Sequence, residues 1–373
     1  MRGPFLAVPI LALLLLFTVP WWTLVLAPEW GTAGFVAGTA LFALGLVTMP
    51  VAMVFGHGKR QRDGAARLGD TLLAVCWVLF TWSVLSLVLR VALLGVDDPA
   101  RSRIVAGAAA LVAVSLLVYG NRVAMRVPPV KATDVVIPRL GPALDGLRVA
   151  VLTDTHFGPI DRTKWSEKVV AAVNALDADV VCHAGDLADG SVARRRKQVD
   201  PLGGVQAKLG RFYITGNHEY FGEAQGWLDH MAGLGWDPLH NRSTLLERGG
   251  DRIVFAGIDD PTGASSGLPG HGPDLPAALD GAPSEVPVVL LAHQPKQVVQ
   301  AREAGIDLQI SGHTHGGQIW PFHFLVRIDQ PMLSGLKRFG ATQVYNSRGT
   351  GFWGPPFRVF APSEITLLTL RRA

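Results

Sequence analysis

The chain has only two cysteines, Cys76 and Cys182, among its 373 residues. Two cysteines cannot supply the disulfide framework of a small secreted domain, and they fit a reducing compartment. Charged residues are also few: lysine, arginine, aspartate and glutamate make up 17% of the chain, whereas hydrophobic residues make up 49%. The hydrophobic share is high for a soluble protein. Where the apolar residues lie along the chain therefore indicates whether part of the chain lies in a membrane.

The apolar excess lies in the first third of the chain, in four long runs that are almost free of charge. They cover residues 5–26, 33–55, 72–94 and 104–119. A helix needs about 20 apolar residues to cross the hydrocarbon core of a bilayer, so the first three runs fit directly and the fourth extends toward Val123. We therefore predict a domain of about four transmembrane helices over residues 1–125, and a multi-pass protein of the cell membrane.

The first run has a competing interpretation as a secretory signal peptide. It lacks a small-x-small cleavage site, and its apolar stretch is long and carries Trp21 and Trp22. Three further apolar runs follow it. These features favour an uncleaved first membrane helix.

Basic residues in the short loops indicate the orientation of the predicted helices. The loops after the second and fourth runs carry Lys59, Arg60, Arg62, Arg67, Arg122, Arg126 and Lys131. The loop around Pro28 has an acidic residue and no basic one, whereas residues 96–103 mix both signs. The pattern predicts that both termini, and with them the rest of the chain, lie on the cytoplasmic side.

The remainder of the chain is predicted to be an α/β domain over residues 147–373, joined through a proline-rich linker at 126–146. Within the linker, residues 135–137 could form an isolated strand. Strands are expected over residues 147–153, 179–183, 211–215, 244–248, 252–257, 287–292, 306–311, 343–345, 358–360 and 365–370, and helices over 162–176 and 222–233. Residues 261–287 are rich in glycine, proline, alanine and serine and are expected to form an exposed loop that could contain one short helix.

Five short polar motifs follow apolar strands in this domain. They are Asp154-Thr155-His156, Gly185-Asp186-Leu187-Ala188-Asp189, Gly216-Asn217-His218-Glu219, His293, and Gly312-His313-Thr314-His315. In open α/β sheets, functional residues gather just beyond the carboxyl ends of the strands, so the motifs are expected to converge at one edge. Carboxylate, amide and imidazole groups suit two divalent ions of intermediate hardness, and the absence of cysteine argues against a structural zinc site.

Together these motifs resemble the signature of the calcineurin-like metallophosphoesterase superfamily, D-x-H, G-D-x-x-D, G-N-H-[DE], H and G-H-x-H. The resemblance covers about residues 147–370, and no motif is substituted. Residues 316–318 and 349–355 are similar to the bacterial membrane-associated branch that includes YkuE-like phosphoesterases. The resemblance implies a four-layer αββα sandwich of two mixed sheets with helices outside, and the second sheet follows from the resemblance alone.

The resemblance also implies a role for each motif residue. The first metal ion would take Asp154, His156, Asp186 and His315, and the second would take Asp186, Asn217, His293 and His313, with Asp186 bridging. His218 would protonate the leaving oxygen or stabilise the phosphoryl oxygens, and Asp189 would orient His218. A helix cap or turn is the alternative role for Asp189. The expected cofactors are two divalent ions, manganese first, with iron, zinc, nickel or cobalt as alternatives.

The expected function is hydrolysis of a phosphoric ester by in-line attack of a metal-bridging hydroxide. Tethering to a bilayer suggests a lipid-linked or membrane-proximal phosphodiester or pyrophosphate as substrate. Gly190 and Ser191 stand where protein phosphatases of the family carry an arginine, which disfavours that class. A nucleic-acid substrate is disfavoured because the domain lacks a basic groove with interleaved aromatics. The alternative is a non-catalytic membrane sensor that binds a phospho-ligand.

Several histidines, an aromatic run and a basic cluster lie outside the five motifs, and most of them are expected to have structural roles. His240 and His271 have no ligand-like context, and His183 is either a second layer of the site or a buried spacer. The aromatic run at residues 320–324 is expected to pack in the core, with an apolar channel or bilayer contact as the alternative. The basic cluster at 194–197 is expected to be a solvated face, with binding of anionic lipid or substrate as the alternative.

Overall fold

The computed structural model describes residues 3–58 and 61–373, in two compact units. The first unit comprises the described residues up to 122 together with 354–359, and the second comprises 123–353 and 360–373. Lys59 and Arg60 lie outside the described residues. The orientation prediction rests partly on them, and the side of the membrane stays a prediction.

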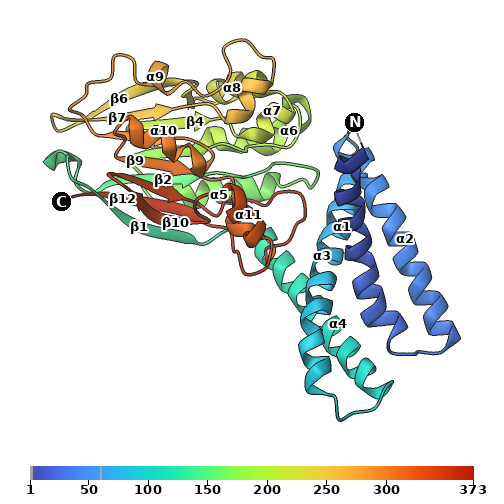
Figure 1. The fold of residues 1–373 in the computed structure, drawn as a ribbon. Helices are drawn as coiled ribbons and strands as arrows, with labels where there is room; N and C mark the ends of the chain where they lie inside the picture. The colour runs from blue at the N-terminus through green and yellow to red at the C-terminus, as the bar shows by residue number, and fades with distance from the viewer. Residues whose placement is uncertain (1–2, 59–60) are drawn as a thin grey trace. The chain divides into compact units, whose positions relative to one another are not determined.

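The first unit is built from four long apolar helices (Figure 1). They are α1 (Gly3–Trp21), which continues into the π-helical turn η1 (Trp22–Leu26), α2 (Thr32–His57), α3 (Asp63–Ala92) and α4 (Ala100–Met125). Within the described residues, four helical segments are long and apolar enough to cross a bilayer, in agreement with the four predicted runs. Large apolar side chains are exposed along them, such as Leu41 at 68% and Val88 at 73%, which suits surfaces that face lipid.

The segment 354–359 packs within the first unit. The backbone N–H of Arg358 donates to the carbonyl of Gly120 over 2.9 Å, and Asn121 Nδ2 donates to the carbonyl of Pro356 over 3.0 Å. The predicted strand over 358–360 is wrong, because the backbone of Arg358 is bonded to a helix and Phe360 forms only an isolated bridge, with Ile319.

The second unit contains two six-stranded mixed sheets. The first has the order β1-β12-β2-β3-β4-β5, and the second has the order β10-β11-β9-β8-β7-β6. The strands of the first sheet are β1 (Val130–Ile137), β2 (Leu147–Leu152), β3 (Val180–Ala184), β4 (Gly210–Ile214), β5 (Asp237–Pro238) and β12 (Ile365–Arg372). Those of the second are β6 (Arg242–Arg248), β7 (Asp251–Gly257), β8 (Val288–Leu291), β9 (Leu308–Ser311), β10 (Gly335–Phe339) and β11 (Thr342–Asn346).

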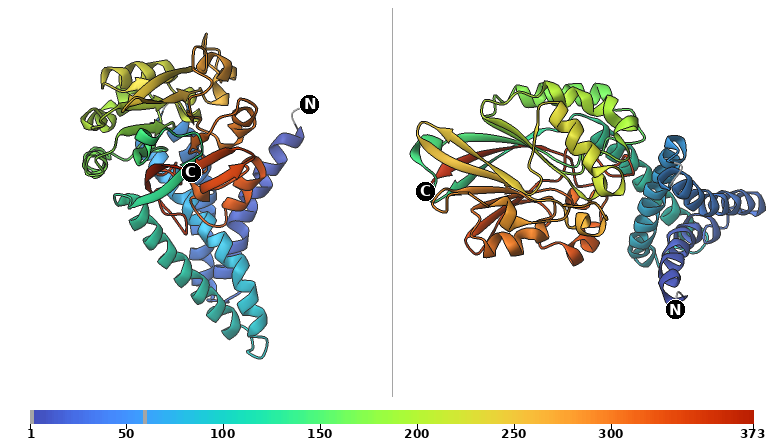
Figure 2. Two further views of the ribbon diagram at one scale, coloured as in Figure 1. Left: turned by 90° about the vertical axis from the view of Figure 1, so that its left-hand side faces the viewer. Right: turned by 90° about the horizontal axis from the view of Figure 1, so that it is seen from above.

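The two sheets pack face to face. Phe212 of β4 and Phe255 of β7 stack with ring centroids 5.3 Å apart, in a buried core to which both sheets contribute. The outer faces are covered by α5 (Thr163–Asn174), α6 (Val192–Val199) and α8 (Ala224–Gly233) on the first sheet, and by α9 (Leu275–Ala278) and α10 (Val298–Glu303) on the second. Figure 2 shows these helices outside the strands. The expected four-layer sandwich is therefore present.

The segment predicted as a linker, 126–146, contributes a strand to the first sheet. Over residues 130–137, β1 pairs in parallel with β12, from Val130 opposite Ile365 to Ile137 opposite Arg372. Val135 and Ile137 are fully buried by this pairing. The apolar pattern indicated only the last three residues of β1, because the rest of this edge strand is partly exposed and polar.

The arrangement of parallel strands brings the motifs to one edge. Strands that are buried on both faces consist of consecutive, mostly apolar residues, and β2 and β3 are of this kind. Neighbouring strands β2, β3 and β4 are parallel, and so are β7, β8 and β9. The motif residues that follow these strands are Asp154, Asp186, Asn217, His293 and His313. The carboxyl edge of the sandwich thus holds all five motifs, as expected.

Candidate metal centre

The backbone of the motif loops is held in a strained conformation. Positive φ angles occur at Asp154 (51°), His156 (43°), Asp186 (53°), His313 (71°) and His315 (52°). Residues other than glycine rarely adopt this left-handed conformation, and each instance costs about 1–3 kcal/mol. The loops support one another, since the N–H of Asp154 donates to the carbonyl of Gly185 over 2.9 Å and that of His156 to Asp186 over 3.1 Å. Strain concentrated at these residues indicates a functional site.

Two motif glycines make room for the carboxylates. A Cβ atom on Gly216 would lie 2.2 Å from Asp186 Oδ1, and one on Gly312 would lie 2.2 Å from Asp154 Oδ2. Such distances are far below van der Waals contact, so any larger residue would displace the carboxylate. The glycines are therefore required by close approach rather than by turn geometry.

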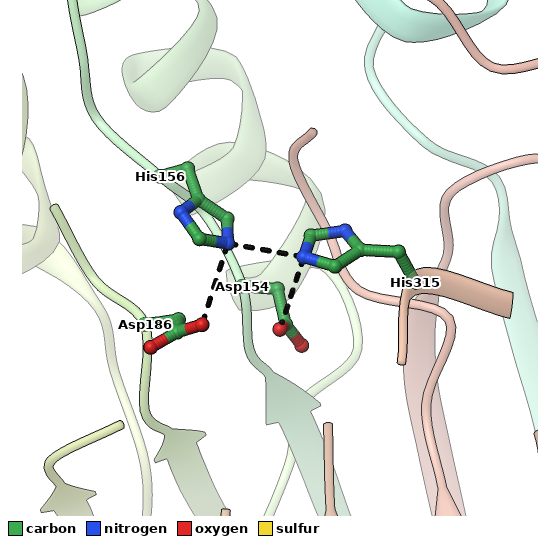
Figure 3. A group of neighbouring side chains, drawn as sticks. All are labelled: Asp154, His156, Asp186 and His315. Carbon is green, nitrogen blue, oxygen red and sulfur yellow. Dashed lines mark hydrogen bonds and ion pairs between the residues drawn. The ribbon is translucent and has the colours of Figure 1, made fainter. Parts of the chain in front are cut away.

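The first group of side chains consists of Asp154, His156, Asp186 and His315, all buried (Figure 3). The Nε2 atoms of His156 and His315 face each other at 3.0 Å. The Nε2 atom of His156 also lies 3.5 Å from Asp186 Oδ2, and that of His315 lies 3.4 Å from Asp154 Oδ1. Two imidazole nitrogens and two carboxylate oxygens that converge in a buried space form a ligand set for a divalent cation.

The second group consists of Asp186, His293 and His313, with Asn217 beside it. His293 Nδ1 donates to the carbonyl of Ala184 over 2.8 Å, so Nε2 of the neutral ring carries a lone pair. That lone pair faces Asp186 Oδ2 at 3.1 Å, and Nε2 is a buried atom without a hydrogen-bond partner in the described part of the chain. Two electron-rich atoms in contact require a shared proton or cation between them.

Asn217 and His313 complete the second group. The side-chain oxygen of Asn217 lies 2.9 Å from His313 Nδ1. The backbone N–H of His313 donates to Asp154 Oδ1 over 2.8 Å, which links this group to the first. Because Asp186 belongs to both groups, the seven predicted ligands form one continuous cluster.

His218 is paired with Asp189 at the border of the cluster. Its Nδ1 lies 2.7 Å from Asp189 Oδ1, and the same oxygen lies 3.1 Å from Nδ1 of His156. Burial alone would lower the pKa of His218, but the carboxylates of Asp186 and Asp189 outweigh it and raise the pKa to about 9. The side chain of His218 is 16% exposed, whereas that of His156 is fully buried. His218 is thus the cationic, accessible imidazole of the group.

Asp189 acts on two imidazoles instead of capping a helix. Its carboxylate contacts His156 and His218, as described above, and its carbonyl accepts a hydrogen bond from Nε of Arg195 over 2.9 Å. Arg195 is buried, so the basic cluster at 194–197 is not wholly a solvated face. A carboxylate behind a candidate metal-ligating histidine fixes the orientation of its ring.

Glu219 holds the motif loops together. It is the last residue of the Gly216–Glu219 motif, but the motif alone predicts no role for it. Its buried carboxylate accepts hydrogen bonds from four backbone N–H groups: Asp186 (3.0 Å), Leu187 (2.7 Å), Ala188 (3.2 Å) and Gly216 (2.6 Å). Glu219 belongs to the short helix α7 (Asn217–Phe221), which also carries Asn217 and His218. One side chain therefore sets the relative position of two ligand loops.

Other histidines are placed differently from the main cluster. His183 is buried and its Nε2 lies 3.1 Å from Thr155 Oγ1, which supports the backbone beside His156. Burial lowers its pKa to about 3, so it is neutral. His240 and His271, which no ligand-like motif surrounds, lie together with Asp259 in a second cluster. Loops bring these three residues together, and no local motif marks them.

Comparisons with known proteins agree with this geometry. Residues 147–317 match the family model described as calcineurin-like phosphoesterase. A transmembrane protein with metallophosphoesterase domain from Danio rerio is 39% identical over 273 residues, which cover 71% of this chain and 62% of that protein. The chain thus spans less than two thirds of that relative's length.

Two bacterial proteins are also similar. A metallophosphoesterase from Campylobacter jejuni is 34% identical over 342 residues, which cover 89% of this chain and 88% of that protein. The metallophosphoesterase YkuE from Bacillus subtilis is 28% identical over 236 residues, which cover 61% of this chain and 80% of that protein.

Proposed function

This chain belongs to the calcineurin-like metallophosphoesterase family, and from that premise we propose that it hydrolyses phosphoric esters at a dinuclear metal centre. The observation that carries the proposal is the buried cluster in which two imidazole nitrogens, 3.0 Å apart, face the carboxylates of Asp154 and Asp186. Electron-rich atoms that converge in a buried site need a cation or shared protons between them, and divalent ions would supply that positive charge.

The ligand set divides into two halves. Asp154, His156, Asp186 and His315 would hold one ion, and Asp186, Asn217, His293 and His313 would hold the other. The buried lone pair of His293 Nε2 fits this assignment, because it lacks a hydrogen-bond partner in the described chain. Two divalent ions there would supply a hydroxide nucleophile at neutral pH and neutralise charge on the phosphoryl oxygens. Manganese is the metal we propose, since carboxylate, carbonyl and water oxygens suit it, while the imidazoles equally suit iron, zinc and nickel.

His218 is the group that we assign to proton transfer. Its Nδ1 is engaged by Asp189 over 2.7 Å, which leaves Nε2–H free to donate to the leaving oxygen. The carboxylates of Asp186 and Asp189 raise its pKa to about 9 against the effect of burial, and Asp189, which is not a proposed ligand, would still favour the protonated ring beside bound metal. The rings of Phe221 and Trp353 flank His218, with centroids 5.2 and 6.1 Å away. Both rings are substantially exposed and can contact an apolar leaving group.

A lipid-linked or membrane-proximal phosphodiester or pyrophosphate is the substrate class that we propose. The four apolar helices tether the chain to a bilayer. The helix α11 (His323–Asp329) follows the last metal motif and exposes Phe324 (59%), Leu325 (51%) and Ile328 (82%). The expectation that residues 320–324 pack in the core is wrong, since none of them is buried.

Basic residues stand close to these apolar side chains along the chain. Arg327 on α11 and Lys337 and Arg338 on β10 are exposed. A combination of exposed aromatic, aliphatic and basic side chains is typical of segments that lie in the interface of an anionic membrane. This composition supports a substrate whose phosphate lies at the lipid headgroup level.

The basic test of the function is metal-dependent turnover by the full chain in detergent. We expect protein stripped of metal to be inactive on bis-p-nitrophenyl phosphate and to regain turnover when Mn²⁺ is restored. Asn217→Ala is expected to need far more Mn²⁺ for half-maximal rate, whereas His230→Ala, whose ring pairs with Asp200 over 2.9 Å, serves as the control and behaves as wild type. Protein that binds two ions but does not hydrolyse diesters, monoesters or phospholipids would instead support the alternative function, a non-catalytic membrane sensor of a phospho-ligand.

The lipid-linked substrate has a separate test on α11. In the double variant Phe324→Ser, Ile328→Ser, we expect KM for a vesicle-embedded p-nitrophenyl phosphodiester of diacylglycerol to rise roughly tenfold or more, because burial of one large apolar side chain contributes about 1.5–3 kcal/mol. Turnover of soluble bis-p-nitrophenyl phosphate is expected to stay unchanged. Leu245→Ser, on β6 and 45% exposed, is the matched control. An equal change on both substrates, or none on either, contradicts the assignment of α11.

A further inference from the structure

A second cluster of metal-ligand side chains lies outside the centre described above. His240 follows β5, Asp259 follows β7, and His271 lies in the loop between the 3-10 turn η4 (Pro261–Ser265) and α9. One ligand atom from each residue lies within 4.8 Å of the other two. His240 Nδ1 is 2.7 Å from Asp259 Oδ1, His271 Nδ1 is 3.7 Å from Asp259 Oδ2, and the two rings have centroids 4.5 Å apart.

The hydrogen bonds around His271 fix its tautomer. Its Nε2 lies 3.1 Å from Oε1 of Gln225, an oxygen that can only accept, so Nε2 carries the proton. Nδ1 therefore accepts from the hydroxyl of Tyr220, which is 3.1 Å away, and lies 3.7 Å from the carboxylate of Asp259. A ring whose outer nitrogen donates to a fixed acceptor while its inner nitrogen faces a carboxylate is the usual arrangement of a metal-ligating histidine.

The buried carboxylates of Asp259 and Asp260 would be stabilised by a nearby positive charge. Asp259 is 1% exposed, and the next residue, Asp260, is fully buried. Asp259 accepts from His240 Nδ1 and from the N–H of Gly272 and faces Nδ1 of His271, while Asp260 accepts from Gln294 Nε2 and from the N–H of Thr262, each over 2.8 Å. Two successive carboxylates out of water are costly unless a cation compensates them.

We propose that His240, Asp259 and His271 bind a third divalent ion, of the zinc class. Two imidazoles and one carboxylate bind zinc in known catalytic sites, with water in the fourth position, and although this set lacks the cysteines of most structural zinc sites, the Tyr220 hydroxyl or water can complete it here. Ligand atoms about 2.0–2.1 Å from a shared ion lie at most about 4.2 Å apart, so the side chains need only small movements to close on it.

The position of the cluster assigns the ion a structural task. Tyr220 belongs to α7, the helix that carries Asn217 and His218. Asp260 is bonded to Gln294, which directly follows His293. An ion at Asp259 therefore fixes the loop over residues 258–274 between two segments that carry proposed catalytic-centre residues, without being part of that centre.

The test is the number of metal ions in full-length protein, loaded with Zn²⁺ in detergent and then dialysed against metal-free buffer. Elemental analysis is expected to give three zinc ions per wild-type chain, and two in each of the variants His240→Ala, Asp259→Asn and His271→Gln. His230→Ala is the control and keeps three, because its partner Asp200 lies outside the cluster. Thermal melting followed by circular dichroism shows whether each variant is folded.

Two zinc ions in the wild type, or three in all folded variants, overturns the third site. Should every variant fail to fold, the wild-type number still decides between two and three. Turnover of bis-p-nitrophenyl phosphate is measured on a second portion of each preparation, stripped of metal and reloaded with Mn²⁺. Wild-type protein that binds two zinc ions and turns over the diester refutes the third site but not the proposed function. Wild-type protein that binds three zinc ions and does not turn over the diester refutes the proposed function but not the third site.

Discussion

Replacement of His218 with alanine is expected to lower kcat on phosphodiesters by about 10²–10⁴-fold, the contribution of a positioned general acid, while both catalytic ions stay bound. His218 is not among the seven proposed ligands, and its ring is oriented by Asp189 over 2.7 Å. Its pKa is raised to about 9 by the carboxylates of Asp186 and Asp189, against the opposing effect of burial, and the hydrogen bond to Asp189 favours the protonated ring. The measurement is kcat together with the metal content of the same preparation.

The leaving group provides a sharper form of this test. A p-nitrophenolate leaves with little help from an acid, whereas an alkoxide needs a proton. The loss of kcat in His218→Ala is therefore expected to be larger for a methyl ester than for a p-nitrophenyl ester. A loss that is the same for both esters, or one accompanied by loss of a metal ion, contradicts the role of His218 as the acid.

Replacement of Glu219 with glutamine is expected to destabilise the second unit and to weaken metal binding. The carboxylate accepts from four backbone N–H groups, two on each oxygen. An amide offers only one oxygen, so two buried N–H groups lose their acceptor, at about 1–3 kcal/mol each. Because roughly 2–4 °C of Tm follows each kcal/mol in a domain of this size, a fall of several degrees is expected.

The control for Glu219 is Glu223→Gln, a chemically identical change nearby. Glu223 is exposed, and its Oε2 accepts one hydrogen bond, from the N–H of Val192 over 3.0 Å. Thermal unfolding and Mn²⁺ titration of the two variants are compared. If Glu219→Gln has the same Tm and the same Mn²⁺ affinity as Glu223→Gln, the Glu219 carboxylate does not hold the two ligand loops in place.

The convergence of the ligand motifs could be predicted because the strands that precede them are buried on both faces. Buried parallel strands read as unbroken apolar runs, as β2 and β3 do, and a polar residue just past such a run marks the carboxyl edge. Long apolar runs likewise identified the four helices of the first unit. In both cases a single physical requirement, burial in protein or in lipid, determines most residues of the segment.

Features that depend on tertiary contacts could not be predicted in this way. The left-handed backbone of Asp154 and His315 follows from bonds between loops, and neither residue type requires it. The edge strand β1 mixes polar and apolar residues, and only Val135 and Ile137 of its residues are buried, so the sequence does not indicate its full pairing with β12. His240 and His271 come from separate loops, and only the fold brings them to Asp259.

The central claim is that Asp154, His156, Asp186, Asn217, His293, His313 and His315 hold two metal ions. Crystals of the Mn²⁺-loaded chain, with diffraction recorded at the manganese absorption edge, test it most directly. We expect two anomalous peaks within this cluster, roughly 3.5–4 Å apart, with the carboxylate of Asp186 between them. A single peak, or two peaks that Asp186 does not bridge, would contradict the dinuclear centre.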